Sequence, residues 1–253
     1  MEYVPEVLPL LPWDRYRIRV SFILPAILAR AEGTRRHSVR VDVFSSGATV
    51  PLSWEEHVET ADPSRAYAFD VNHRLTATGL DPYAPSYVVL TATTISSTPL
   101  PSVLKVIGYW VSYQNAHVYA VIPSSVQYAS SRMVVGANPE LALVDYFGEA
   151  VVSSSHASMI AMINPFPGIS HATISFRAPN GSSWKHEITL APRTVAWMDV
   201  AALAAERGMS TGAWSVTITS SHRVVSYGFI RDRQTGWQES ADHTIPWVNR
   251  VPG

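Results

Sequence analysis

Between Ser158 and Trp247 the sequence alternates apolar and polar residues in short runs, and Pro, Gly, Asn and Ser separate these runs. Such alternation turns one face of each strand towards a core and the other towards solvent. The Asn-Gly pair at 180–181 is a strong signal for a hairpin turn. One stretch differs, because Asp199 suits a helix N-cap and Gly208 suits a left-handed C-cap. We therefore predict an antiparallel β-sandwich with a short helix at one corner.

The first half of the chain repeats this pattern more weakly. Residues 37–50 match residues 171–184 in pattern at a fixed offset, with a strand and a turn in each. Residues 63–71 resemble residues 191–200, because each segment holds a Pro, an Arg and an aromatic residue before an Asp-Val pair. This ordered recurrence predicts an internal duplication. The expected fold is all-β, with two tandem antiparallel β-sandwich domains that each carry a short corner helix.

The expected domain boundaries follow from the runs of strands and from composition. We predict an apolar N-terminal arm, a first sandwich, a linker and a second sandwich, at residues 1–15, 16–123, 124–140 and 141–253. The arm contains Pro5, Pro9 and Pro12, and proline is unfavourable in a helix interior and in a central strand. Two alternatives stay open for the arm, which either packs along its own domain or reaches a neighbouring subunit.

The low content of charged residues bears on association. Only 15% of the residues are charged and 47% are hydrophobic, whereas about 25% charged is usual in soluble domains. A chain of this kind must hide surface, and burial against other subunits predicts a homo-oligomer or a larger assembly with an unknown protein partner. The net charge of −1 provides no overall field to attract nucleic acid, so no nucleic-acid partner is expected.

Other bulk features exclude several classes of protein. The absence of cysteine excludes disulfides, thiolate metal sites and a cysteine nucleophile. The first residues lack the basic segment of a signal peptide. The apolar run 20–29 has about half the length of a membrane helix, and Pro25 interrupts it. We expect no membrane insertion and synthesis in the cytoplasm without export by the general pathway. The final location, cytoplasm or virion, stays open.

Several short motifs in the second half carry a family resemblance. They are Met162-Ile163-Asn164-Pro165, Ala172-Thr173-Ile174-Ser175-Phe176, Ile188-Thr189-Leu190-Ala191-Pro192-Arg193, Asp199-Val200, Ser215-Val216-Thr217-Ile218, Ser220-Ser221, Val224-Val225 and Arg231-Asp232-Arg233-Gln234. Through them, residues 141–247 resemble the sensory rhodopsin transducer family and related β-sandwich repeats of large bacterial surface proteins. The resemblance implies a small all-β module without enzymatic activity that oligomerises and contacts a partner. The chain departs from the transducers in having two units and in the Tyr227-Gly228 pair.

The densest polar cluster follows the last clear strand. It comprises Arg231, Asp232, Arg233 and Gln234, with Glu239, Asp242 and His243 close in sequence. Two arginine forks could hold a carboxylate, a phosphate or a sugar. The alternative is a surface loop that satisfies its own ion pairs. We take Arg231, Asp232, Arg233 and Gln234 as the candidate binding residues.

A second set of polar residues lies in the first half. Glu55, His57 and Glu59 would project from one face of a strand and could bind a divalent metal. A solvated strand face explains them as well, so we predict no metal and no cofactor. The chain has no H-E-x-x-H, no G-x-S-x-G and no Gly-rich phosphate loop. No residue is therefore predicted to be catalytic.

These observations predict a non-enzymatic structural or adaptor protein that self-associates and presents loops to a partner. One alternative is a viral structural protein, such as a coat, decoration or tail component. The other is a carbohydrate-binding or carbohydrate-cleaving protein, whose two carboxylates would stand about 5 to 10 Å apart. Its candidate pairs are Asp199 with Asp232 and Glu239 with Asp242. Separately, Trp184, Trp197, Trp214 and Trp237 could line a sugar or peptide groove, and packing as core and rim aromatics explains them as well.

Overall fold

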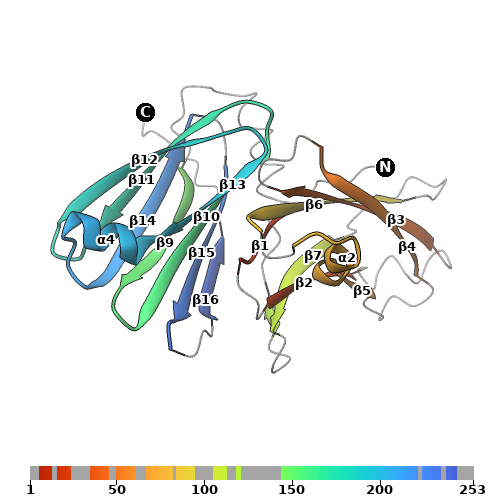
Figure 1. The fold of residues 1–253 in the computed structure, drawn as a ribbon, viewed down its shortest axis with the longest axis horizontal. Coiled ribbons are helices and arrows are strands. Elements are labelled where there is room, and N and C mark those ends of the chain that lie inside the picture. Colours follow the sequence, from red (N-terminus) through yellow and green to blue (C-terminus); the bar gives the residue numbers. More distant parts are fainter. Residues whose placement is uncertain are drawn as a thin grey trace, which may run out of the picture. The chain divides into compact units, whose positions relative to one another are not determined.

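The computed structural model consists mostly of antiparallel strands, which confirms the predicted all-β fold (Figure 1). The structure describes residues 6–12, 16–23, 35–45, 50–60, 67–81, 84–94, 105–112, 118–120, 144–221, 224–234 and 238–243. The chain divides into two compact units, Met1–Tyr128 and Ala129–Gly253. Among the described residues, no helix has the length and apolar character needed to cross a membrane.

The second unit contains two four-stranded sheets and a corner helix. One sheet has the order β12-β11-β14-β9, and the other has the order β13-β10-β15-β16. The strands are β9 (Val144–Val152), β10 (His156–Asn164), β11 (Ser170–Arg177), β12 (Ser183–Leu190), β13 (Thr194–Asp199), β14 (Gly212–Ser220), β15 (Val225–Asp232) and β16 (Gln238–His243), and the helix is α4 (Val200–Arg207).

The core of the second unit follows from alternation along its central strands. In β11 every second residue is buried, including Ile174 and Phe176. These side chains cluster with Ile160 and Met162 of β10 and with Val216 of β14. Each large apolar side chain buried in this way contributes about 1.5–3 kcal/mol of transfer free energy. The predicted sandwich core is therefore present in this unit.

The sheet that contains β10 is also apolar on the face turned away from this core. Ala161 of β10, Tyr227 and Phe229 of β15 and Val195 of β13 are 0%, 0%, 1% and 7% exposed. They alternate with core residues such as Ile160, so they point to the opposite side. The strands of a sheet that is buried on both faces have nearly continuous apolar sequences. Burial within the chain thus accounts for part of the apolar composition that the sequence analysis assigned to oligomer contacts.

The first unit also has two four-stranded sheets, with the orders β1-β6-β3-β4 and β5-β2-β7-β8. Its strands are β1 (Glu6–Leu10), β2 (Tyr16–Ile23), β3 (Arg35–Ser45), β4 (Leu52–Thr60), β5 (Tyr67–Asp70), β6 (Ser86–Thr94), β7 (Lys105–Ser112) and β8 (Val118–Ala120), and its helix is α2 (Val71–Ala77). Each sheet of the first unit has the same order of equivalent strands as a sheet of the second unit. In this comparison β1 takes the place of β9, and α2 takes the place of α4.

The described part of the predicted arm is a strand of the first unit. β1 pairs antiparallel with β6, and Val7, Leu8 and Leu10 are fully buried. Pro9 is tolerated there because β1 is an edge strand, where the missing N–H costs no central ladder bond. Of the two alternatives for the arm, residues 6–12 show packing along their own unit. The expected boundary after residue 15 thus falls inside this unit.

Each unit contains an equivalent row of three paired residues across three neighbouring strands. In the second unit the ladder runs from Met198 to Ile160 to Gly228, and in the first it runs from Phe69 to Val20 to Gly108. Both rows begin one residue before an aspartate that caps a helix, and both end at a glycine. These glycines therefore provide a common reference point for comparing the two units.

One part of the predicted alignment between the halves is wrong by one position. Matching residues 37–50 with 171–184 sets Val41, which is fully buried, against the half-buried Ser175. Both neighbours of Ser175 are buried, since Ile174 is 0% and Phe176 is 1% exposed. A shift of one residue along a strand exchanges its two faces. The alternating pattern therefore aligned the two strands but did not fix which of their residues face the core.

Candidate functional site

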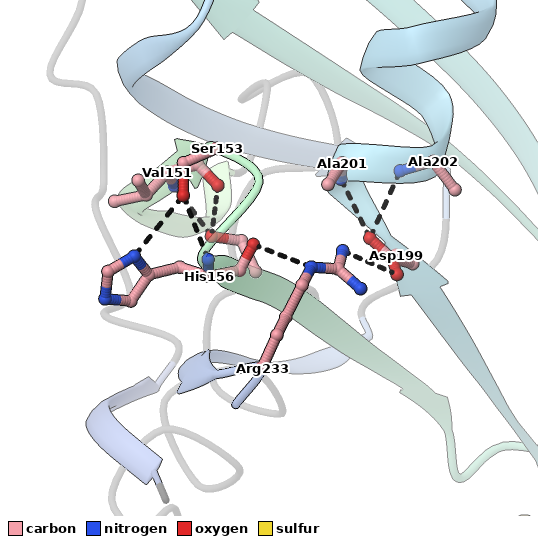
Figure 2. Close-up of polar contacts among 8 residues, drawn as sticks. Val151, Ser153, His156, Asp199, Ala201, Ala202 and Arg233 are labelled. Atoms are coloured by element: carbon pink, nitrogen blue, oxygen red, sulfur yellow. Dashed lines mark hydrogen bonds and ion pairs between the residues drawn. The ribbon is translucent and has the colours of Figure 1, made fainter. Parts of the chain in front are cut away.

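Arg233 lies in the turn after β15 and joins three segments of the second unit (Figure 2). Its Nε donates to the main-chain oxygen of His156 at 3.2 Å, and its Nη2 donates to a carboxylate oxygen of Asp199 at 3.4 Å. Its main-chain N–H donates to the carbonyl oxygen of Ser155 at 2.8 Å. One side chain thus connects the turn after β15, the start of β10 and the end of β13.

We call the site formed by Arg233, Asp199 and His156 the corner. Asp199 lies at its centre because both of its carboxylate oxygens accept hydrogen bonds. Oδ1 accepts from the main-chain N–H groups of Ala201 at 2.9 Å and Ala202 at 3.2 Å, and Oδ2 accepts from Arg233. The carboxylate also lies at the positive end of the helix dipole. The side chains of Arg233 and Asp199 are 40% and 31% exposed, so the ion pair is worth about 0–1 kcal/mol.

The turn between β9 and β10 adds hydroxyl groups beside this corner. The Oγ of Ser155 lies 2.8 Å from Nδ1 of His156, and the Oγ of Ser153 lies 3.3 Å from the same nitrogen. Ser153 also accepts the main-chain N–H of His156 at 2.9 Å. A hydroxyl against an imidazole is an element of nucleophilic catalysis, but here these groups are neighbours in sequence and hold their own turn. The only signal in the sequence was the Ser-Ser-Ser-His run at 153–156.

The structure separates the four predicted binding residues. Arg233 and Gln234 are exposed in the turn, whereas Arg231 and Asp232 are half-buried at the end of β15. Asp232 lies opposite His156 in the ladder, and Arg231 lies opposite Ala157. Glu239, Asp242 and His243 lie on β16 beside β15, and their side chains fall outside the described residues. Arg233 alone therefore has described contacts that join it to Asp199.

The weak metal candidates lie on β4. Glu55 and His57 are both exposed, and Glu55 accepts a hydrogen bond from Ser38 Oγ at 3.1 Å. The side chain of Glu59 is outside the described part of the chain. Within that part, no group of three or more His, Asp or Glu side chains could hold a metal ion. The described contacts of Glu55 are those of a polar strand face.

The described tryptophans contribute to packing. Trp184 stacks on Phe176 with ring centroids 5.0 Å apart, and the guanidinium of Arg207 lies 5.6 Å from its ring centroid. Trp214 is 4% exposed and donates from Nε1 to Ser210 at 3.1 Å. The ring of Trp197 lies 5.6 Å from that of Phe229, and Trp237 is outside the described residues. Each of these three rings therefore has a described packing contact.

No family model matches this chain. No curated protein matches it at a significant level. The resemblance to the sensory rhodopsin transducer family stays a prediction from the motifs of the second half.

Proposed function

We propose that this chain is a non-enzymatic structural or adaptor module that self-associates and presents the end loops of its second unit to a protein partner. The observation that carries the proposal is the corner built on Arg233. Its guanidinium donates to Asp199 and to His156, and Asp199 in turn caps α4. Polar groups used in this way fix the shape of exposed loops. A pre-shaped loop loses less conformational freedom when a partner binds.

Self-association is supported by composition and by the open sheets. The chain has 15% charged residues, and burial on both faces of the sheet that contains β10 explains only part of this deficit. All four described sheets are open. Each one ends in edge strands with main-chain groups that can pair with another chain. β4 and β12 carry charged side chains such as Glu55 and Lys185, which disfavour pairing there and leave the other edges as contact sites.

We also propose that the two units arose by internal duplication. The support is the shared order of strands and helix, the capping aspartates Asp70 and Asp199, and the matched glycines Gly108 and Gly228. The resemblance of the second half to the sensory rhodopsin transducers supports the proposed self-association, since it implies a small module that oligomerises. Cytoplasmic synthesis remains part of the same proposal.

Co-expression of two differently tagged copies of the full chain tests self-association. Purification through one tag should recover the second tag in comparable amount, because copies assemble as they fold. The control mixes the two copies only after separate expression and lysis, which detects adventitious sticking. Recovery of a single tag from the co-expressing cells contradicts the proposed function.

A further inference from the structure

The sheet that contains β10 ends at β13, and in the described part of the chain β10 is the strand that pairs with β13. The other end strands of the second unit carry charged residues within the strand, which disfavour pairing with another chain. These are Asp145 and Glu149 of β9, Lys185 and Glu187 of β12, and Glu239 and Asp242 of β16. Residues 194–198 of β13 read Thr-Val-Ala-Trp-Met and contain no charge. β13 is therefore the edge of this unit best suited to pairing.

The side chains of β13 are less buried than those of β10 beside it. Ala196 packs against the core between the two sheets, opposite Met162 in the ladder. Ala196 is only half-buried, whereas Met162 is 0% exposed. On the other face Trp197 is half-buried, and its ladder partner Ala161 is 0% exposed. Apolar surface thus remains open along β13, and an added strand would cover it.

Opposite charges flank the uncharged part of β13. Arg193 comes directly before the strand and is exposed, and its main-chain N–H donates to the carbonyl oxygen of Phe166 at 3.2 Å. Asp199 is the last residue of the strand, and its side chain is 31% exposed. A strand with a cation before it and an anion at its end is complementary in charge to a second copy that runs in the opposite direction.

Two-fold symmetry restricts the register of such a pair. A two-fold axis perpendicular to a sheet keeps each face on its own side, so residues opposite one another must belong to the same face. With Ala196 on the axis, Val195 lies opposite the partner's Trp197, a β-branched and aromatic pair that stabilises a sheet. The same register brings Arg193 opposite the partner's Asp199. An axis at Val195 or at Trp197 would separate these two charges.

We propose that β13 pairs antiparallel with β13 of a second copy across a two-fold axis at Ala196, which joins two four-stranded sheets into one. This inference rests on the proposed self-association and names the strand that carries it. Asp199 can take part because its Oδ2 accepts one described hydrogen bond, from Arg233 (Figure 2). A carboxylate oxygen has two lone pairs, so Oδ2 can also accept from the partner's Arg193.

A single cysteine tests this register because the natural chain has none. In Ala196→Cys the two thiols of the pair lie opposite one another, and any disulfide must join two chains. Opposite residues in an antiparallel pair have Cα atoms about 4.5–5.5 Å apart, within the range of about 4.4–6.8 Å for disulfides. The matched control is His186→Cys, since His186 is also half-buried and lies on the charged edge strand β12.

After mild oxidation of the full chain, Ala196→Cys should migrate mainly as a covalent dimer on a non-reducing gel, and His186→Cys mainly as a single chain. Equal cross-linking of the two variants, or preferential cross-linking of His186→Cys, in a protein that self-associates overturns the pairing of β13 and leaves the self-association intact. A natural chain that keeps the mass of one chain at every concentration overturns the pairing and the proposed function together.

Charge variants test the flanking pairs without altering the strand itself. Arg193→Glu places like charges opposite one another twice in each dimer and should raise its dissociation constant about tenfold. Arg193→Lys keeps the charge and should bind nearly as well as the natural chain. Arg177→Glu, at an exposed arginine at the end of β11, makes the same change in net charge and should leave the constant unchanged. Equal effects of Arg193→Glu and Arg177→Glu in sedimentation velocity would overturn the proposed register.

Discussion

Asp70 and Asp199 hold the same place in the two units, where each ends a strand and caps the helix that follows. Asp70 accepts the main-chain N–H of His73 at 3.0 Å. Asp199 accepts two, from Ala201 and Ala202, and also pairs with Arg233. The buried residue after each cap is a valine, Val71 or Val200. This explains why an Asp-Val pair recurs in the sequence.

The first prediction concerns these caps. Asp199→Ala should lower the free energy of unfolding of the second unit by about 1–2 kcal/mol, because a cap and an ion-pair partner are lost together. Asp70→Ala should destabilise the first unit by about 0.5–2 kcal/mol, because it removes the N-cap of α2. Urea unfolding followed by tryptophan fluorescence measures both values. Asp199→Asn serves as the control, since its amide oxygen keeps the cap. A loss below about 0.3 kcal/mol for either alanine variant would count against the capping role of that aspartate.

The second prediction concerns the role of Arg233. Arg233→Ala should cost about 0–1 kcal/mol of global stability because the ion pair is half-exposed. It should still speed hydrogen exchange at the main-chain amides of residues 153–158, whose turn loses its anchor. Arg233→Lys should resemble the alanine variant, since one ammonium cannot reproduce the two directions of the guanidinium fork. Hydrogen exchange of these amides is measured by mass spectrometry. Unchanged exchange rates in both variants would refute the anchoring role of Arg233.

The third prediction tests the second apolar face of the sheet that contains β10. Phe229 is 1% exposed and lies against Trp197 on that face. Phe229→Ala should therefore destabilise the second unit by about 3–5 kcal/mol, as for a core aromatic. Phe176→Ala, within the core between the two sheets, is the matched comparison and should cost a similar amount. A loss below about 1 kcal/mol for Phe229→Ala would show that this face is exposed to solvent.

Local features of the fold could be predicted from the sequence because they depend on neighbouring residues. Asp199 caps the start of α4 with its carboxylate, and Gly208 ends the helix with a φ of 62°, which its lack of a Cβ atom allows. The turn at residues 178–182 joins β11 to β12 and places Gly181 at a φ of 86°. Each of these signals lies within a few residues of the structure that it specifies.

Features that depend on long-range register could not be predicted in the same way. The contact between Arg233 and Asp199 joins residues 34 positions apart, and only the pairing of β10 with both β13 and β15 brings them together. β1 was assigned to an arm because Pro9 disfavours a central strand, but its place at a sheet edge removes that penalty. Burial on both faces of a sheet requires knowledge of the layers, which alternation along one strand does not contain.

The mass of the chain in solution tests the central claim most directly. Sedimentation velocity over a series of concentrations, at low and at high salt, should give at least twice the single-chain mass of 27.8 kDa. The association should persist at high salt because apolar burial is not screened by ions. A species that stays at 27.8 kDa at every concentration would contradict the account of this protein as a self-associating module.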